Sequence, residues 1–374
     1  MEKKRLYVSG VHGVEYGDYY FIGNDQNNSI CRIDRKNNEV KVIACSKLDK
    51  YDLLTCWAKS AIIEDKVLFA PIYGNDFVLY DISNDEVYHL KADINDEFSR
   101  CAKYWEVIAA DRNFYIMGNK VPVVTRINAY TREMVNICEW KAEDYKELTN
   151  EKKRFCFGDG HAIIGNKLYA PFCGKDKLFE YDYVLDKYEI IGIRTKVCNF
   201  FSISNDGANM WITGNNEKTV CVHNPKTGAS LDIDIPEAGT WFAPVFLDGF
   251  AFLFPENSNA KIYKINMESY EVIEVEKMKD LDQGDQNNRD VWLPMWKEEH
   301  SFMLLRKPDC TWIKLNVCTG NFSRQIYTID DEDFVFSLKR DYFERKYGDN
   351  IKKIVIDEKN MSLDDYLFGV AMLT

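Results

Sequence analysis

Residues 155–193 read FCFGDGHAIIGNKLYAPFCGKDKLFEYDYVLDKYEIIGI. Four short runs rich in β-branched and aromatic residues alternate here with turn residues. Gly165-Asn166 separates the first two runs, Gly174 lies between the second and third, and Asp182 opens the last turn. Runs of this kind bounded by Gly, Asn or Asp are typical of strands joined by hairpins. The stretch therefore predicts a meander of four antiparallel strands.

The third strand of this unit, with the residue that closes it, recurs seven times along the chain. The closing residues are 47, 47, 54, 42, 42 and 50 positions apart, which is close to the roughly 40–50 residues of a propeller blade. A short Asp or Asn side chain can accept hydrogen bonds from backbone amides just after it. We therefore expect these residues to close turns and not to catalyse. They are Asp34, Asp81, Asn128, Asp182, Asn224, Asn266 and Asn316.

Four-stranded meanders in tandem bury both of their faces when they pack radially. We predict an all-β fold, a seven-bladed β-propeller over residues 1–330. The chain resembles the β-propeller superfamily, with units of kelch-like length. It has neither the Gly-Gly doublet of kelch repeats nor the Gly-His and Trp-Asp pairs of WD40 repeats, so the resemblance implies a fold and no family function.

Two regions depart from the repeat. Residues 331–374 read as a C-terminal extension, with a strand at 351–357 and a short helix at 366–373 that we expect to pack on the propeller. The long spacing between Asn128 and Asp182 leaves room for an inserted helix around residues 141–150.

Composition narrows the possible partners and the compartment. The net charge of −12 repels phosphate backbones, so nucleic acid is not an expected partner. No apolar run reaches signal-peptide or membrane-span length, so we expect no membrane association. The eleven cysteines form no CxxC pair and read as free thiols of a cytoplasmic protein.

The first strands of propeller blades line the central channel, so the residues at their starts converge on the axis and form a natural pocket. These positions are unusually aromatic. Aromatic rings around a funnel can stack on a glycan, a peptide or a cation, but the same rings can also pack one blade against the next. The aromatic candidates for ligand binding are Trp57, Trp105, Phe157, Phe201, Trp241 and Trp292.

Two of the five histidines, His12 and His161, fall at the same position of the first strand, in blades one and four. Glu106 takes that position in blade three, Ser60 in blade two and Ser202 in blade five. Two imidazoles, a carboxylate and hydroxyls around one axis make a plausible acid–base set. The alternative is that each histidine satisfies a buried hydrogen bond between blades.

Asp159 lies two residues before His161, and we predict that it also binds the ligand. Gly158 and Gly160 flank it and would let a ligand approach the backbone closely. The remaining histidines, His89, His223 and His300, read as surface or packing residues.

No other sequence motif indicates a reaction or a bound ion. The chain has no HExxH or Cys/His metal spacing, no Gly-x-Ser-x-Gly nucleophile, no phosphate-binding glycine loop, and no EF-hand pattern in residues 280–290. We expect no metal and no cofactor. Two hypotheses remain. One is a propeller that binds a small molecule, glycan, peptide or protein at its axial face. The other is a lyase, epimerase or hydrolase acting on a sugar or peptide through His12 and His161.

Overall fold

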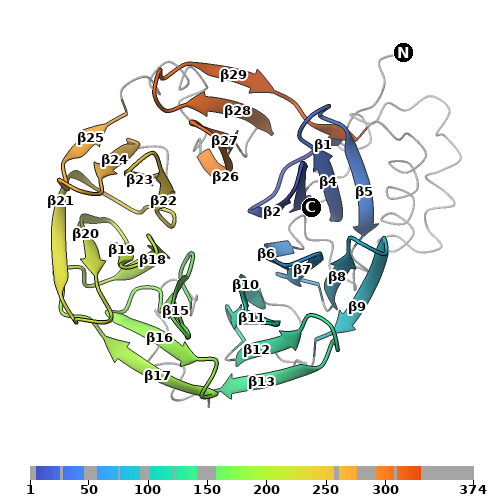
Figure 1. The fold of residues 1–374 in the computed structure, drawn as a ribbon, viewed down its shortest axis with the longest axis horizontal. Coiled ribbons are helices and arrows are strands. Elements are labelled where there is room, and N and C mark those ends of the chain that lie inside the picture. Colours follow the sequence, from blue (N-terminus) through green and yellow to red (C-terminus); the bar gives the residue numbers. More distant parts are fainter. Residues whose placement is uncertain are drawn as a thin grey trace, which may run out of the picture.

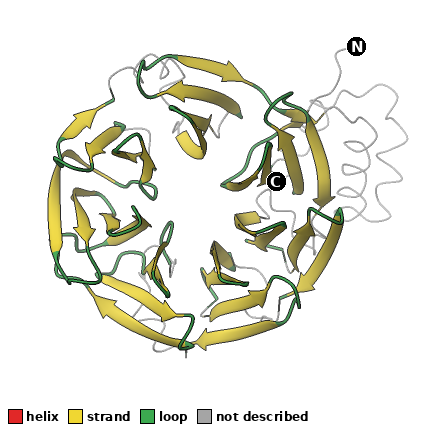
Figure 2. Ribbon diagram, in the orientation of Figure 1, coloured by secondary structure: helices red, strands yellow, loops and turns green. Residues whose placement is uncertain are grey.

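The structure is a computed structural model that describes residues 6–25, 28–45, 57–74, 76–92, 102–121, 123–140, 157–256, 261–275, 292–306 and 310–329. All regular elements in these ranges are β-strands, and all but the first and the last of them form seven four-stranded antiparallel sheets around a ring (Figures 1 and 2). The predicted seven-bladed propeller is confirmed. The predicted C-terminal strand and helix, the helix near 141–150 and the loop 280–290 lie outside the described residues.

Each blade is built from four consecutive strands. Blade 1 holds β2 (Gly13–Tyr16), β3 (Tyr19–Gly23), β4 (Ser29–Asp34) and β5 (Val40–Cys45). Blade 2 holds β6 (Trp57–Ile63), β7 (Lys66–Pro71), β8 (Asp76–Asp81) and β9 (Glu86–Lys91). Blade 3 holds β10 (Tyr104–Ala110), β11 (Asn113–Gly118), β12 (Val123–Asn128) and β13 (Met134–Glu139). Blade 4 holds β14 (Ala162–Ile164), β15 (Lys167–Pro171), β16 (Lys177–Asp182) and β17 (Lys187–Gly192).

The second half of the ring repeats this plan. Blade 5 holds β18 (Phe200–Asn205), β19 (Met210–Gly214), β20 (Glu217–His223) and β21 (Ser230–Gly239). Blade 6 holds β22 (Val245–Leu247), β23 (Phe250–Leu253), β24 (Tyr263–Asn266) and β25 (Val272–Glu274). Blade 7 holds β26 (Trp292–Glu298), β27 (Ser301–Arg306), β28 (Thr311–Asn316) and β29 (Phe322–Gln325). In Figure 1 the first strand of each blade lies nearest the axis and the fourth lies on the rim.

The recurring Asp or Asn closes the turn between the third and fourth strands in all seven blades. In each turn its Oδ1 accepts at least one hydrogen bond from a backbone N–H two or three residues later. The fourth residue after it always has a positive φ, whether it is Gly228 at 73° or Tyr270 at 60°. The predicted turn role of these residues is confirmed, and the side chain supplies the acceptor that the turn requires.

Neighbouring blades share hydrophobic clusters, and in the described residues there is one cluster for each of the seven blade interfaces. Strand β11 shows why. Its residues Phe114 and Ile116 pack toward blade 2, whereas Tyr115 and Met117 pack toward blade 4. Alternate side chains of a strand point to opposite faces, and here both faces are buried. This explains why the middle strands are continuous apolar runs.

A two-stranded clasp closes the ring. Strand β1 (Leu6–Tyr7) pairs with β30 (Thr328–Ile329), so the first and last described strands meet between blades 7 and 1 (Figure 1). The N–H of Val8 donates to the carbonyl of Tyr327 at 2.9 Å, and Nε1–H of Trp312 donates to the carbonyl of Val8 at 2.9 Å. In the described part of the chain, every blade is built from four strands that are consecutive in the sequence. Among the described residues there is no helix that could cross a bilayer.

Candidate functional site at the propeller axis

A cavity of about 230 Å³ lies on the axis, because all seven blades contribute residues to its lining. Blades 1 to 5 supply a mostly polar wall, and blades 6 and 7 supply a mostly apolar one. The polar wall holds His12, Lys59, Glu106, Asp159, His161 and Ser204, and the apolar wall holds Phe242, Ala243, Pro244, Val245, Leu293 and Pro294.

Irregularities in the first strands position two of the charged residues. In blade 2 the pairing moves from Trp57↔Pro71 to Ser60↔Phe69, which inserts one extra residue beside Lys59. In blade 3 the pairing shifts in the same way between Tyr104 and Glu106. A β-bulge redirects the side chains around it, and bulges often lie beside functional sites.

Lys59 links two carboxylates inside the cavity. Its Nζ lies 2.9 Å from Oε2 of Glu106 and 2.7 Å from Oδ1 of Asp159, and its side chain is only 10% exposed. Burial by itself lowers the pKa of Lys59, but the two carboxylates outweigh burial and raise it above its usual range. Burial likewise raises the pKa of Glu106, yet the Lys59 ammonium and the His161 hydrogen bond lower it to about 2. Lys59 and Glu106 are therefore both charged at neutral pH.

The segment that carries Asp159 is fastened to blade 5. The N–H of Asp159 donates to the carbonyl of Phe201, and its own carbonyl accepts from the N–H of Ile203. A Cβ on Gly158 would lie 1.9 Å from the Phe201 carbonyl oxygen, and Gly160 has a φ of 73°. The two glycines therefore make room for the neighbouring strand, and Oδ2 of Asp159 accepts the N–H of Ala243 at 2.8 Å.

Glu106 orients His161. Oε1 of Glu106 lies 2.9 Å from Nδ1 of His161, and Oε2 accepts the N–H of Gly160 at 3.0 Å. An ionised carboxylate only accepts hydrogen bonds, so Nδ1 must be the donor. In the neutral ring Nε2 then carries the lone pair, and the side chain of His161 is 33% exposed. In many enzymes the catalytic base is oriented by a hydrogen bond to a second group in the same way.

Two other polar groups at the cavity lack partners. Nδ1 of His12 and Oγ of Ser204 are enclosed and make no hydrogen bond in the structure. Burial and the nearby Lys59 ammonium lower the pKa of His12 to about 4, so the ring is neutral at pH 7. Buried polar atoms are nearly always satisfied, so unsatisfied ones at a cavity indicate a place where a ligand could bond.

The structure brings together four of the site residues predicted from sequence: His12, Glu106, Asp159 and His161 all line the cavity. Ser60 is buried and is not part of the lining. Sequence reasoning missed Lys59 and Ser204. The bulge that turns Lys59 toward the axis leaves no mark in the residue pattern, because simple alternation assigns that position to Ser60.

The six predicted aromatic ligand residues are not among the residues that line the cavity. Trp57, Phe157, Trp241 and Trp292 are each at most 6% exposed and belong to the clusters between blades. Trp105 is partly buried against the cluster of blades 2 and 3, and Phe201 uses its carbonyl to hold Asp159. The structure thus places the five rings other than that of Phe201 in, or beside, the packing between blades.

Comparison with known proteins identifies the fold. No family model and no curated protein matches the chain. Among solved structures, virginiamycin B lyase from Staphylococcus aureus is similar over 82% of this chain and 96% of its own, with 10% identity and a TM-score of 0.60.

A catalytically inactive alanine variant of that lyase, in complex with quinupristin, has 11% identity and a TM-score of 0.59, over 81% of this chain and 95% of its own. BamB from Moraxella catarrhalis has 12% identity and a TM-score of 0.53, over 81% and 83% of the two chains. At these identities the similarity shows that the chain has the β-propeller fold.

Proposed function

We propose that the axial cavity is the active site of an enzyme that moves a proton on a small amphipathic substrate. The observation that carries the proposal is the hydrogen bond between Glu106 and Nδ1 of His161, with the rest of the ring open to the cavity. Lyases, epimerases and hydrolases share such a proton transfer.

His161 is the proposed general base. Its Nε2 takes the proton, and the ionised carboxylate of Glu106 stabilises the imidazolium that forms. The contacts of Lys59 with Glu106 and Asp159 engage two of the three N–H donors of its ammonium, which leaves one for negative charge that develops on the substrate. His12, neutral at pH 7, and Ser204 would hydrogen-bond to the substrate.

The walls of the cavity limit the substrate. A volume of about 230 Å³ is below the roughly 300–1,000 Å³ of pockets that enclose drug-sized ligands, so the cavity would hold a small molecule or one end of a larger one. Pro244, Leu293 and Pro294 present apolar atoms opposite the charged groups. A peptide-like or acyl group fits a cavity with one charged and one apolar wall better than an unsubstituted sugar does.

The similar solved structures are compatible with this proposal. One is a lyase, and the form described as catalytically inactive carries alanine in place of a histidine. A propeller of this shape can therefore hold chemistry that depends on a histidine. Binding without turnover is the second candidate, because the unsatisfied atoms of His12 and Ser204 also suit a ligand that does not react.

The test begins with a thermal-shift screen of the full chain against peptides, peptide esters, sugars and nucleotide sugars, followed by turnover assays on every ligand that stabilises it. His161→Asn is then compared with wild type, since the Asn amide can keep the hydrogen bond to Glu106 but has no counterpart of Nε2. We expect turnover to fall by about 10²–10⁴-fold with ligand binding retained.

His89→Asn is the matched control, because His89 lies on the outer strand β9 and should leave turnover unchanged. Stabilising ligands without turnover in wild type would support the binding function instead. Turnover that survives in His161→Asn would refute the proposed role of this histidine.

A further inference from the structure

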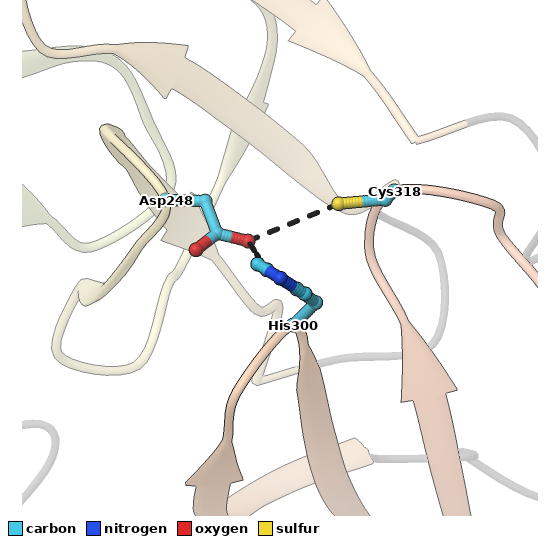
Figure 3. A group of neighbouring side chains, drawn as sticks. All are labelled: Asp248, His300 and Cys318. Atoms are coloured by element: carbon cyan, nitrogen blue, oxygen red, sulfur yellow. Dashed lines mark hydrogen bonds and ion pairs between the residues drawn. The ribbon is translucent and has the colours of Figure 1, made fainter.

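Three potential metal ligands meet on the surface of blades 6 and 7 (Figure 3). Asp248 lies in the turn between β22 and β23, His300 in the turn between β26 and β27, and Cys318 in the turn between β28 and β29. Turns after first strands and after third strands emerge at the same end of a propeller. The group therefore lies at the end opposite the starts of the first strands, away from the axial site.

The separations between these side chains are close to those of a metal centre. Oδ2 of Asp248 lies 2.8 Å from Nδ1 of His300 and 3.9 Å from Sγ of Cys318. One ligand atom from each of the three residues lies within 4.8 Å of the other two. Bonds of about 2.1 Å to nitrogen or oxygen and about 2.3 Å to sulfur place tetrahedral ligands roughly 3.4–3.6 Å apart. Side-chain rotations that change these separations by at most about 1.2 Å would reach that spacing.

We propose that Asp248, His300 and Cys318 form a binding site for Zn²⁺ or a similar borderline-soft divalent cation. A carboxylate, an imidazole and a thiolate are together a zinc donor set, whereas Mg²⁺ and Ca²⁺ prefer oxygen alone. All three residues are exposed, so a fourth position is open to water.

The charges around the site favour a cation. Oδ2 of Asp248 contacts Nδ1 of His300 at 2.8 Å, and the acidic residue Glu299 directly precedes His300 in the sequence. The negative charges of these two acidic residues would attract a divalent cation to this place.

A bound ion would join two blades. Asp248 belongs to blade 6, while His300 and Cys318 belong to blade 7, and no covalent bond links their turns directly. Since an ion that binds only the folded state stabilises it, Zn²⁺ should raise the melting temperature. The site thus predicts a metal-dependent cross-link between adjacent blades.

The test uses Co²⁺ as a spectroscopic substitute, added to the full chain under a thiol-free phosphine reductant. We expect the visible bands of tetrahedral Co²⁺ together with a thiolate-to-cobalt charge-transfer band, and both should disappear when Zn²⁺ displaces the cobalt. Cys318→Ser should abolish the charge-transfer band, and Asp248→Asn, which keeps an Asn-compatible turn, should weaken Co²⁺ binding at least about tenfold.

Cys198→Ser is the matched control, since Cys198 is also an exposed thiol but lies between blades 4 and 5. It should keep both the bands and the Zn²⁺-dependent rise in melting temperature, which Cys318→Ser should lose. Absence of a charge-transfer band in wild type, or its persistence in Cys318→Ser, would overturn the proposal.

Discussion

Lys59 is a charged side chain that lies between two carboxylates and is almost fully buried. Replacing it with Met would leave Glu106 and Asp159 side by side with no cation, and breaking a buried ion pair in this way typically costs about 3–5 kcal/mol. We expect Lys59→Met to lower the free energy of unfolding by that amount, measured by chemical denaturation. Lys36→Met, at an exposed pair with Asp18, is the control and should leave stability nearly unchanged.

His12 gives the axial site a predictable response to acid. Its pKa is about 4 in the folded chain and near 6.5 when unfolded, so the unfolded state binds more protons between these values. Stability should therefore be complete above about pH 6.5 and fall as the pH drops toward 4. Across this pH window, the melting temperature should change less with pH for His12→Gln than for wild type. An unchanged slope would show that His12 is not held neutral.

The residues of the candidate site were partly predictable from the sequence. His12 and His161 could be placed together because the repeat fixes their register, and Glu106 followed once one turn was adjusted. Lys59 could not be found, because a single inserted residue in β6 reverses which side chain faces the axis. The tryptophans were ambiguous for another reason. Near the axis, a large ring can serve either a pocket or a blade interface, and residue type does not distinguish the two.

The turn between third and fourth strands is the element that the sequence reveals best, since its signal is local. Asn266 illustrates it: Oδ1 accepts the N–H groups of Glu268 and Ser269, both at 2.9 Å. We expect Asn266→Ala to lower the free energy of unfolding by about 1 kcal/mol, because these donors lose their acceptor. Asn266→Asp should be tolerated, as three of the seven blades use Asp here. Equal losses in both variants would contradict the turn role.

The first strands were less predictable than these turns. Their hydrogen-bond ladders are interrupted near the axis in blades 2, 3, 5 and 7, where the register shifts by one residue. Such shifts depend on how seven strands crowd around one axis, which is a tertiary effect. Local patterns of Gly, Asn and Asp carry no information about it.

At the scale of the whole molecule, the clasp between β1 and β30 decides whether the ring stays closed. Removing residues 1–8 would take away β1, the buried Val8 and two hydrogen bonds to blade 7 and its following segment. Burial of a valine and two hydrogen bonds together contribute about 4 kcal/mol. We expect a loss of this size in the free energy of unfolding. Removal of residues 1–5 alone, which keeps β1, is the control and should leave the contribution of the clasp intact.

The same clasp has a consequence for protein engineering. Leu6 and Ile329 are direct partners, so the two positions lie one strand spacing apart, about 5 Å. In a variant without residues 1–5 and 330–374, a linker of a few residues could join them, and the backbone could then be opened at a connection between two blades. Every such circular permutant would still consist of seven intact, sequence-continuous blades. The packing of the blades would therefore be the same whichever blade came first along the chain.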